Sequence, residues 1–255
     1  MGAGWQRQHM KIGILETGEV NAALIGRHGD YAAMFAALLK ASDEKLEFAT
    51  VSVVRGEMPN NPHQADGWIV TGSRHGVYDD LPWIAPLKAF LVECCGKSVP
   101  VVGVCFGHQI LAEALGGRVE KSGKGWGAGV HEYHVVNRPK WMQHGADDFS
   151  IRALHQDQVV ELPPTATVLA SSDFCEYAAL AYGDPDHPWA ISIQPHPEFS
   201  AEYVGSIVQM RRGVAIPAET ADQAIDSLAK PVDNELWANW MVDFLKAAAA
   251  RRQAA

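Results

Sequence analysis

The sequence contains few cysteines, and their spacing does not suit a metal site or a redox pair. Four cysteines occur among 255 residues, at positions 94, 95, 105 and 175, and no two of them form a Cys-x-x-Cys motif. Zinc ribbons and dithiol redox sites use that motif, so we expect neither of them and no bound metal. Residues 1–11 lack the apolar run of a signal peptide. We therefore expect no export and reduced thiols in a cytoplasmic protein.

The chain also lacks an excess of positive charge. Lys and Arg number 21 against 30 Asp and Glu, which gives a formal charge of −9 with neutral histidines. A nucleic-acid-binding protein needs a basic face to neutralise phosphates, so we expect no nucleic-acid partner. No run of about 18 apolar residues is present, so we expect no membrane-spanning helix. Hydrophobic residues make up 47% of the chain, which is typical of a globular protein with a substantial core.

Strand-like and helix-like segments alternate over the first 117 residues. Short apolar or β-branched runs predict buried strands, whereas Ala- and Leu-rich stretches with apolar residues every three or four positions predict helices. The predicted strands are residues 11–15, 48–54, 67–71 and 99–104, and the predicted helices are residues 30–41, 82–95 and 106–115. This order predicts an α/β fold with three layers, in which helices cover both faces of a mostly parallel open sheet of the flavodoxin-like type.

The pattern changes after residue 117, where strand-like segments follow one another closely. They predict a smaller antiparallel extension of the sheet, followed by one more strand and a helix. These segments are residues 130–136, 149–154, 167–170 and 178–182, then the strand at 189–194 and the helix at 201–212. We expect one main domain over residues 11–213. Residues 214–255 are predicted to form a helical C-terminal extension packed on the same domain.

The clearest chemical signal surrounds Cys105. A buried strand ends in Gly103-Val-Cys105-Phe-Gly107 and continues directly into a helix. Small residues two positions before and after a nucleophile suit a tight strand-to-helix turn, where larger side chains would collide with backbone. The helix N-terminus favours a thiolate, and the N–H of Phe106 would point to the place where an oxyanion forms. The alternative is that Cys105 is a small buried apolar residue and the glycines serve packing.

A thiol nucleophile needs a histidine, and the histidine needs a group that orients it. Gln194-Pro-His196-Pro-Glu198 directly follows a predicted strand. In an extended segment the Glu198 carboxylate lies on the same side as the His196 imidazole, where it can accept the Nδ1–H and leave Nε2 for the thiol. By itself His-Pro-Glu is more often an ordinary loop. Downstream of the Cys105 turn on a parallel sheet, it predicts a catalytic Cys-His-Glu triad.

The two motifs together, 91 residues apart from Cys105 to His196, resemble those of class I (triad-type) glutamine amidotransferases. The resemblance extends over about residues 11–212, and it is closest to free-standing members, γ-glutamyl peptidases and the glutaminase domain of GMP synthase. It implies hydrolysis of glutamine to glutamate and ammonia through a γ-glutamyl thioester, without a cofactor. Cys105 matches the nucleophile, His196 the general base and acid, and Glu198 the orienting carboxylate.

The same resemblance implies further site residues. Gly72, in Thr-Gly72-Ser after a predicted strand, and Phe106 match the two backbone donors of the oxyanion hole, although the family's usual glycine run is absent here. Gln109 matches a position lining the glutamine pocket, while His155 and Gln156 match the segment that holds the α-amino and α-carboxylate groups. Two of these have plain alternatives: Gln109 as a capping or surface residue, and His155 as a buried core histidine with satisfied hydrogen bonds.

The chain lacks the parts of a complete biosynthetic amidotransferase. Neither a Ser-Gly-Gly-x-Asp-Ser loop nor a Gly-x-x-x-x-Gly-Lys-Ser/Thr loop occurs, and the 57 residues after Glu198 are too few for an ATP-dependent synthetase domain. We expect a stand-alone hydrolase acting on glutamine or another γ-glutamyl compound, or a glutaminase subunit with a separate ammonia-accepting synthetase. A γ-glutamyl peptidase is the alternative, since both reactions attack the same carbonyl group.

Three other interpretations remain. An α/β-hydrolase with cysteine at the turn would take its acid from a separate strand, which Glu198 contradicts. A catalytically degenerate regulatory or binding subunit would not need all three triad residues. A metal site at His131-Glu-Tyr-His134 would need four-residue histidine spacing on a helix, and this segment alternates like a strand.

Overall fold

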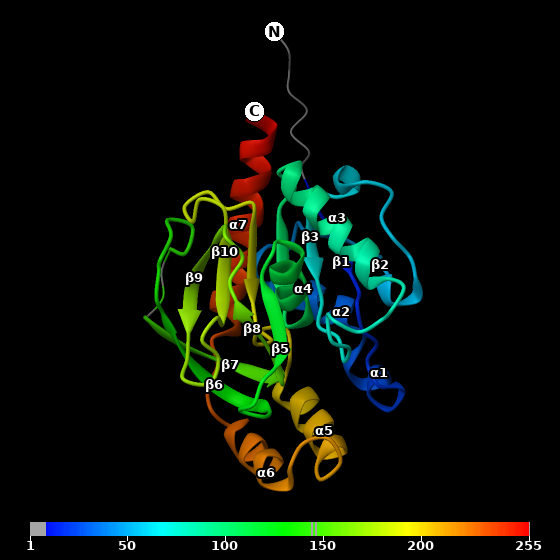
Figure 1. Ribbon diagram of the computed structural model, residues 1–255, viewed down its shortest axis with the longest axis vertical. Coiled ribbons are helices and arrows are strands. Elements are labelled where there is room, and N and C mark those ends of the chain that lie inside the picture. The colour runs from blue at the N-terminus through cyan, green and yellow to red at the C-terminus, as the bar shows by residue number, and fades with distance from the viewer. Residues whose placement is uncertain (1–8, 144, 146, 255) are drawn as a thin grey trace.

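The structure, a computed structural model, describes residues 9–143, 145 and 147–254. We expected no signal peptide at the start of the chain. Most of that segment, residues 1–8, lies outside the described residues. Five parallel strands form one half of a nine-stranded sheet (Figure 1). In spatial order they are β2 (Glu47–Val51), β1 (Lys11–Leu15), β3 (Gly67–Val70), β4 (Val101–Val104) and β11 (Ala190–Ile193). Every residue of β3, β4 and β11 is buried, as expected for strands covered on both faces.

Four antiparallel strands continue the same sheet beyond β11. They are β10 (Ala179–Tyr182), β9 (Ala166–Ser171), β6 (Gly127–Val135) and β7 (Asp148–His155). A separate antiparallel pair is formed by β5 (Arg118–Lys121) and β8 (Asp157–Glu161). The predicted α/β fold is confirmed: the sheet is mixed, with five parallel strands and an antiparallel extension of four strands.

Helices cover both faces of the sheet, as predicted. On one face, α2 (Tyr31–Ser42) and α7 (Asn234–Ala254) pack on the strands through a core that contains Phe35 and Trp237. On the other face, α3 (Ile84–Gly96) and α4 (Phe106–Ala114) enclose a second core (Figure 1). The central strands therefore lie between the two cores, which cover both of their faces.

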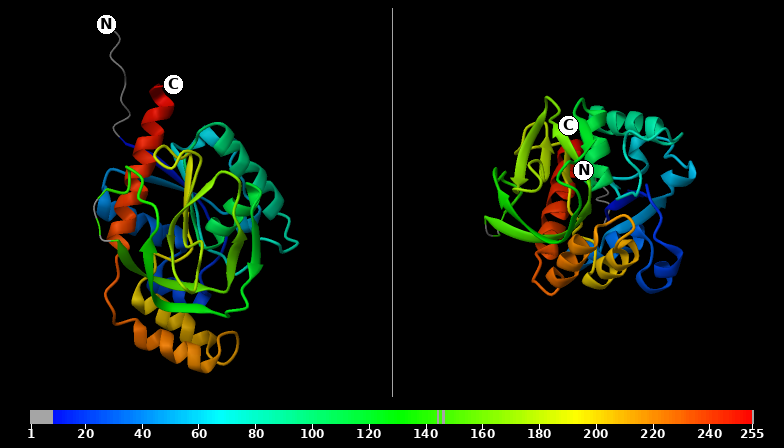
Figure 2. Two further views of the ribbon diagram at one scale, coloured as in Figure 1. Left: turned by 60° about the vertical axis from the view of Figure 1, so that its left-hand side comes forward. Right: turned by 60° about the horizontal axis from the view of Figure 1, so that its bottom comes forward.

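The remaining helices are α1 (Ala22–His28), α5 (Ala201–Arg211) and α6 (Ala218–Ser227). Two short 3₁₀ turns, Val53–Arg55 and Pro62–Gln64, lie before β3. Helices α5 and α6 lie together at one end of the sheet in all views (Figures 1 and 2). Among the described residues, no helix combines the length and the apolar character that crossing a membrane requires.

The C-terminal helix contributes to the main core. Trp237, Trp240 and Phe244 of α7 are fully buried, and the rings of Trp237 and Trp240 contact Phe149 of β7 edge-on. Burial of large aromatic side chains stabilises a fold by several kcal/mol each, so we expect removal of α7 to be strongly destabilising. The division of the chain at residue 213 stays a prediction.

Candidate active site

Three neighbouring parallel strands end at the same edge of the sheet. In the register of the sheet, Val70 of β3 pairs with Gly103 of β4, and Val104 of β4 pairs with Ile193 of β11. The residues that follow these strands therefore emerge side by side at the carboxyl edge, where α/β folds bind ligands. The first strand leads to Gly72, the second to Cys105 and the third to His196.

Cys105 occupies the strand-to-helix turn in a strained backbone conformation. Its φ is +53°, in the left-handed region that residues with a Cβ rarely adopt. A Cβ on Gly103 would overlap the carbonyl oxygen of Gly107, and a Cβ on Gly107 would overlap the carbonyl oxygen of Val70. The N–H of Cys105 donates to the carbonyl oxygen of Ile193 at 2.9 Å. Glycines on both sides of Cys105 are thus required by close backbone contacts.

Replacing Gly107 with alanine is expected to destabilise the protein. The added Cβ meets backbone of β3, which cannot rotate away, so we expect the free energy of unfolding to fall by about 1 to 3 kcal/mol. Gly96→Ala is the matched control, because no atom lies within 4 Å of a Cβ at that helical position. Chemical denaturation of both variants measures the difference. Equal stability of the two variants would show that the turn tolerates a side chain at position 107.

His196 and Glu198 form a buried pair next to this turn. Nδ1 of His196 lies 2.7 Å from Oε1 of Glu198, and their side chains are 4% and 0% exposed. The imidazole stacks on the ring of Phe199 with centroids 3.9 Å apart, and the backbone N–H of His196 donates to the carbonyl oxygen of Arg152 at 2.8 Å. The ring is therefore fixed on its face, at one nitrogen and through its backbone.

The charges around His196 favour its protonated form. Burial lowers the pKa of His196, but the Glu198 carboxylate and a Cys105 thiolate close to the ring outweigh burial and raise that pKa to about 10. Cys105 itself lies at the N-terminus of α4, where the helix dipole favours negative charge. The arrangement suits a thiolate–imidazolium ion pair.

Gly72 lies where the Cys105 and His196 side chains meet. A Cβ on Gly72 would lie 2.9 Å from Cε1 of His196 and 3.7 Å from Cβ of Cys105. Only glycine allows the chain to approach the imidazole this closely. The structure thus brings the predicted residues after β3, β4 and β11 together at one point.

The chain segment at Gly72 is held by a neighbouring loop. Oγ1 of Thr17 donates to the carbonyl oxygen of Thr71 at 2.9 Å, and the N–H of Thr17 donates to Oγ1 of Thr71 at 3.0 Å. Phe106 is the first residue of α4, so its N–H has no acceptor within the helix. The use of the Gly72 and Phe106 N–H groups as an oxyanion hole stays a prediction. Sequence reasoning did not find Thr17, which carries no motif.

A cavity of about 590 Å³ adjoins Cys105, and the three predicted substrate-binding residues Gln109, His155 and Gln156 all line it. Nε2 of Gln109 donates to the carbonyl oxygen of Asp157 at 2.9 Å and to Oε1 of Gln194 at 3.1 Å. Burial lowers the pKa of His155 to about 3, so its ring is neutral at physiological pH. The amide of Gln109 thus supports the wall of the cavity, and the contact of these residues with substrate stays a prediction.

Other side chains line the cavity without having been predicted. They include Arg74 and Tyr78, in the chain after β3, and Arg211 at the end of α5. The hydroxyl of Tyr78 donates to Oδ2 of Asp157 at 2.8 Å, which joins this chain segment to β8. Arg74 could have been predicted as a site residue, because it follows the predicted site residue Gly72 by only two positions. Arg211 had no signal in its local sequence.

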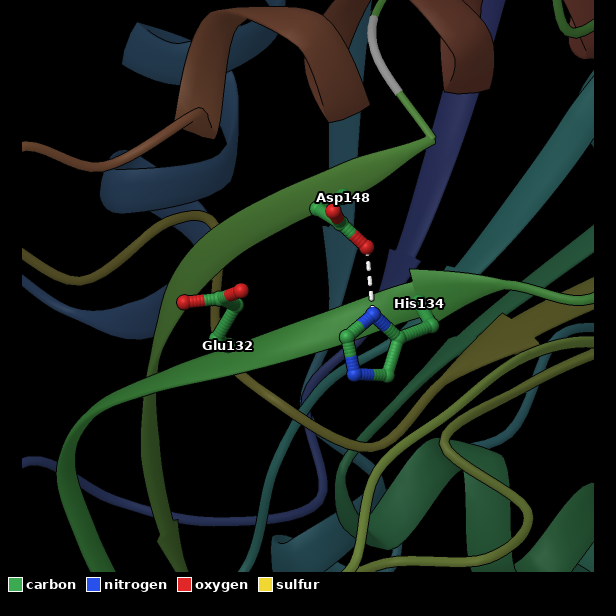
Figure 3. A group of neighbouring side chains, drawn as sticks. All are labelled: Glu132, His134 and Asp148. Carbon is green, nitrogen blue, oxygen red and sulfur yellow. Dashed lines mark hydrogen bonds and ion pairs between the residues drawn. The ribbon is translucent and has the colours of Figure 1, made fainter.

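A group of three titratable side chains lies away from this cavity, on β6 and β7. Figure 3 shows His134 and Asp148 pointing toward one another across the two strands, with Glu132 nearby. His134 and Asp148 are directly opposite in the β6–β7 register, and Nδ1 of the histidine contacts Oδ1 of the aspartate. All three are exposed, so an ordinary cross-strand pair accounts for the contact. His131, the first residue of the His131-Glu-Tyr-His134 segment, hydrogen-bonds instead to the carbonyl oxygen of Ala128.

Comparison with known proteins identifies relatives over most of the chain. The family model for glutamine amidotransferase class-I matches residues 31–208. A glutamine amidotransferase-like protein of Schizosaccharomyces pombe is 31% identical over 250 residues, which cover 92% of this chain and 98% of that protein. γ-Glutamyl peptidase 3 of Arabidopsis thaliana is 30% identical over 230 residues, covering 86% of this chain and 90% of the peptidase.

Solved structures of glutamine amidotransferases have a similar fold. The crystal structure of a glutamine amidotransferase from Thermotoga maritima superposes with a TM-score of 0.70 at 20% sequence identity, covering 93% of this chain and 99% of that chain. The family resemblance expected from the Cys105 and His196 motifs is therefore confirmed. This chain belongs to the class I glutamine amidotransferase family.

Proposed function

We propose that the protein hydrolyses a γ-glutamyl amide with Cys105 as nucleophile, and that glutamine is converted to glutamate and ammonia. The observation that carries the proposal is the convergence of Cys105 and of the buried His196–Glu198 pair on Gly72. A carboxamide is a poor electrophile, so it requires a thiolate and a site that stabilises the developing oxyanion.

The proposed reaction has two steps. The Cys105 thiolate attacks the γ-carbonyl carbon, and the N–H groups of Gly72 and Phe106 stabilise the tetrahedral oxyanion. His196 donates its proton to the departing nitrogen, which leaves as ammonia, and a γ-glutamyl thioester remains on Cys105. His196 then takes a proton from water, which attacks the thioester and releases glutamate. Glu198 stabilises the imidazolium throughout and keeps Nε2 directed at the reacting atoms.

A γ-glutamyl peptidase is the second candidate, and the volume of the cavity favours it. A cavity of about 590 Å³ is within the range that accepts drug-sized molecules, whereas glutamine is much smaller. The relative named γ-glutamyl peptidase 3 also spans 86% of this chain. Glutamine and γ-glutamyl peptides share the reacting carbonyl group, so both candidates use the same three side chains.

The proposal also covers the assembly and the compartment in which the protein acts. The protein acts as a stand-alone hydrolase, or as a glutaminase subunit beside a separate ammonia-accepting synthetase. Its thiol chemistry requires a reducing compartment such as the cytoplasm, and all four cysteines are free. A degenerate regulatory or binding subunit is the alternative from a different class, and turnover by the purified chain alone would exclude it.

Labelling with a glutamine-analogue alkylator tests the proposal. We expect the purified chain to release glutamate from glutamine or from a γ-glutamyl peptide, and the alkylator to stop this release by modifying Cys105 first. Burial raises the pKa of the Cys95 and Cys175 thiols to about 12, so these remain protonated and react slowly at neutral pH. Peptide mass mapping identifies the modified residue. Earlier labelling of another cysteine, or no glutamate release from any of these compounds, would contradict the proposal.

A further inference from the structure

The lining of the cavity beside Cys105 holds three cationic side chains against two acidic ones. Arg74, Lys121 and Arg211 line it, and none of them forms an ion pair with a residue that the structure describes. Its two acids, Asp79 and Asp157, already have partners in the same wall, a histidine ring and a tyrosine hydroxyl. The chain as a whole has a formal charge of −9, so this local excess of cations is specific to the cavity. Such a site attracts anions.

Two of these cations also border a second cavity. Arg74 and Arg211 line both the cavity at Cys105 and an adjoining space of about 220 Å³. The second space is also lined by Tyr31 and by Glu19, whose carboxylate pairs with Arg55. A substrate that extends from Cys105 into the second cavity must therefore pass these two arginines, Arg74 and Arg211.

The guanidinium of Arg211 is partly held in place before any ligand binds. It lies 5.8 Å from the ring centroid of Trp126, in cation–π contact, at the C-terminal end of α5. Packing against an aromatic ring restricts the side chain without neutralising its charge. The N–H donors of a guanidinium match a carboxylate in a planar, two-point geometry. Arg211 is thus preorganised to bind a carboxylate group.

We propose that Arg74 and Arg211 bind a carboxylate in the leaving group, so that the preferred substrate is a γ-glutamyl peptide with a free C-terminal carboxylate. This inference rests on the proposed function. Hydrolysis consumes one water, cleaves the γ-amide bond and releases glutamate and the peptide amine, which takes the proton from His196. The leaving-group carboxylate itself does not react. Glutamine has no such group, because its leaving group is ammonia.

Three substrates test the assignment. γ-Glutamylglycine has a carboxylate in its leaving group, γ-glutamylglycinamide lacks that charge, and glutamine lacks the whole group. We expect R74Q and R211Q each to lower kcat/KM for γ-glutamylglycine by about tenfold or more, chiefly through KM, since each removes a charged hydrogen bond. For the other two substrates kcat/KM should change by less than about twofold. R211K, which keeps the charge, should retain part of the activity on γ-glutamylglycine.

R27Q is the matched control. The Arg27 side chain is 65% exposed and pairs with Glu202 on the surface, away from both cavities, so all three substrates should be turned over as by the unmodified chain. An equal loss for all three substrates in R74Q or R211Q would overturn the inference, because the arginines would then hold the α-carboxylate of the glutamyl group. Unchanged kinetics would overturn it as well. If the unmodified chain turns over none of the three, the proposed function itself fails.

Discussion

Cys105→Ala is expected to abolish glutamate release, with kcat reduced by at least about a thousandfold. The reason is that this substitution removes the only atom proposed to form a bond with substrate, and nothing else in the proposed mechanism replaces it. Alanine and cysteine both carry a Cβ, so the cost of the φ of +53° is the same for the two residues. The variant should therefore fold and still bind substrate.

Cys95→Ala provides the matched control. Cys95 is half-buried on α3, and burial raises the pKa of its thiol to about 12, so its removal should leave turnover unchanged. The assay measures glutamate from glutamine and from γ-glutamyl peptides, and chemical denaturation confirms that both variants fold. Turnover retained in Cys105→Ala would rule out the thiol mechanism, whatever the fold and the family.

The placement of the predicted catalytic residues follows from local sequence together with one rule of topology. Gly72, Cys105 and His196 each come shortly after a buried run, and parallel neighbouring strands end at the same edge of a sheet. The prediction that these residues lie close together therefore did not depend on the conformations of the loops. The glycines at 103 and 107 strengthened the interpretation, because small residues at those two positions suit a tight turn from strand to helix.

Other parts of the fold have no such local signal. Helix α1 (Ala22–His28) has seven residues, none of them buried, and its one apolar run is too short to show the spacing of an amphipathic helix. Strand β5 (Arg118–Lys121) buries only one of its four residues and exists because it pairs with β8 (Asp157–Glu161). The predicted strand at residues 48–54 ends at Val51, because the chain turns into a short 3₁₀ helix that Gly56 closes with a φ of +86°. Tertiary pairing and turn geometry determine whether these segments form helices or strands and where they end.

The residues that line the cavity could not be predicted from local sequence either. Trp126 and Arg211 are separated by 85 positions and meet only because the end of α5 lies against the loop before β6. The chemistry of an amide hydrolase is carried by short motifs, whereas selection among its substrates depends on contacts between distant segments. For this reason the reaction class could be proposed from the sequence motifs, whereas the leaving-group preference could be proposed only from the structure.

Glu198→Gln is expected to leave the fold intact and to lower kcat by about a hundredfold to ten-thousandfold. The amide has the same shape as the carboxylate, but it carries no charge to stabilise the imidazolium of His196. Oε1 of Glu198 lies 2.7 Å from Nδ1 in a site from which water is excluded, so the loss of charge is not compensated by solvent. Glu202→Gln, on the exposed surface of α5, is the control and should turn over substrate normally.

The pH profile separates this role from a purely structural one. In the unmodified protein the Glu198 carboxylate helps to raise the pKa of His196 to about 10, against the effect of burial. Without that charge burial lowers the pKa, and the imidazolium loses its proton at lower pH. Because the proposed active form is the thiolate–imidazolium pair, the alkaline limb of kcat/KM should move to lower pH in Glu198→Gln. An unchanged limb together with an unchanged rate would remove Glu198 from the mechanism, whereas a lower rate with an unchanged limb would assign it to positioning alone.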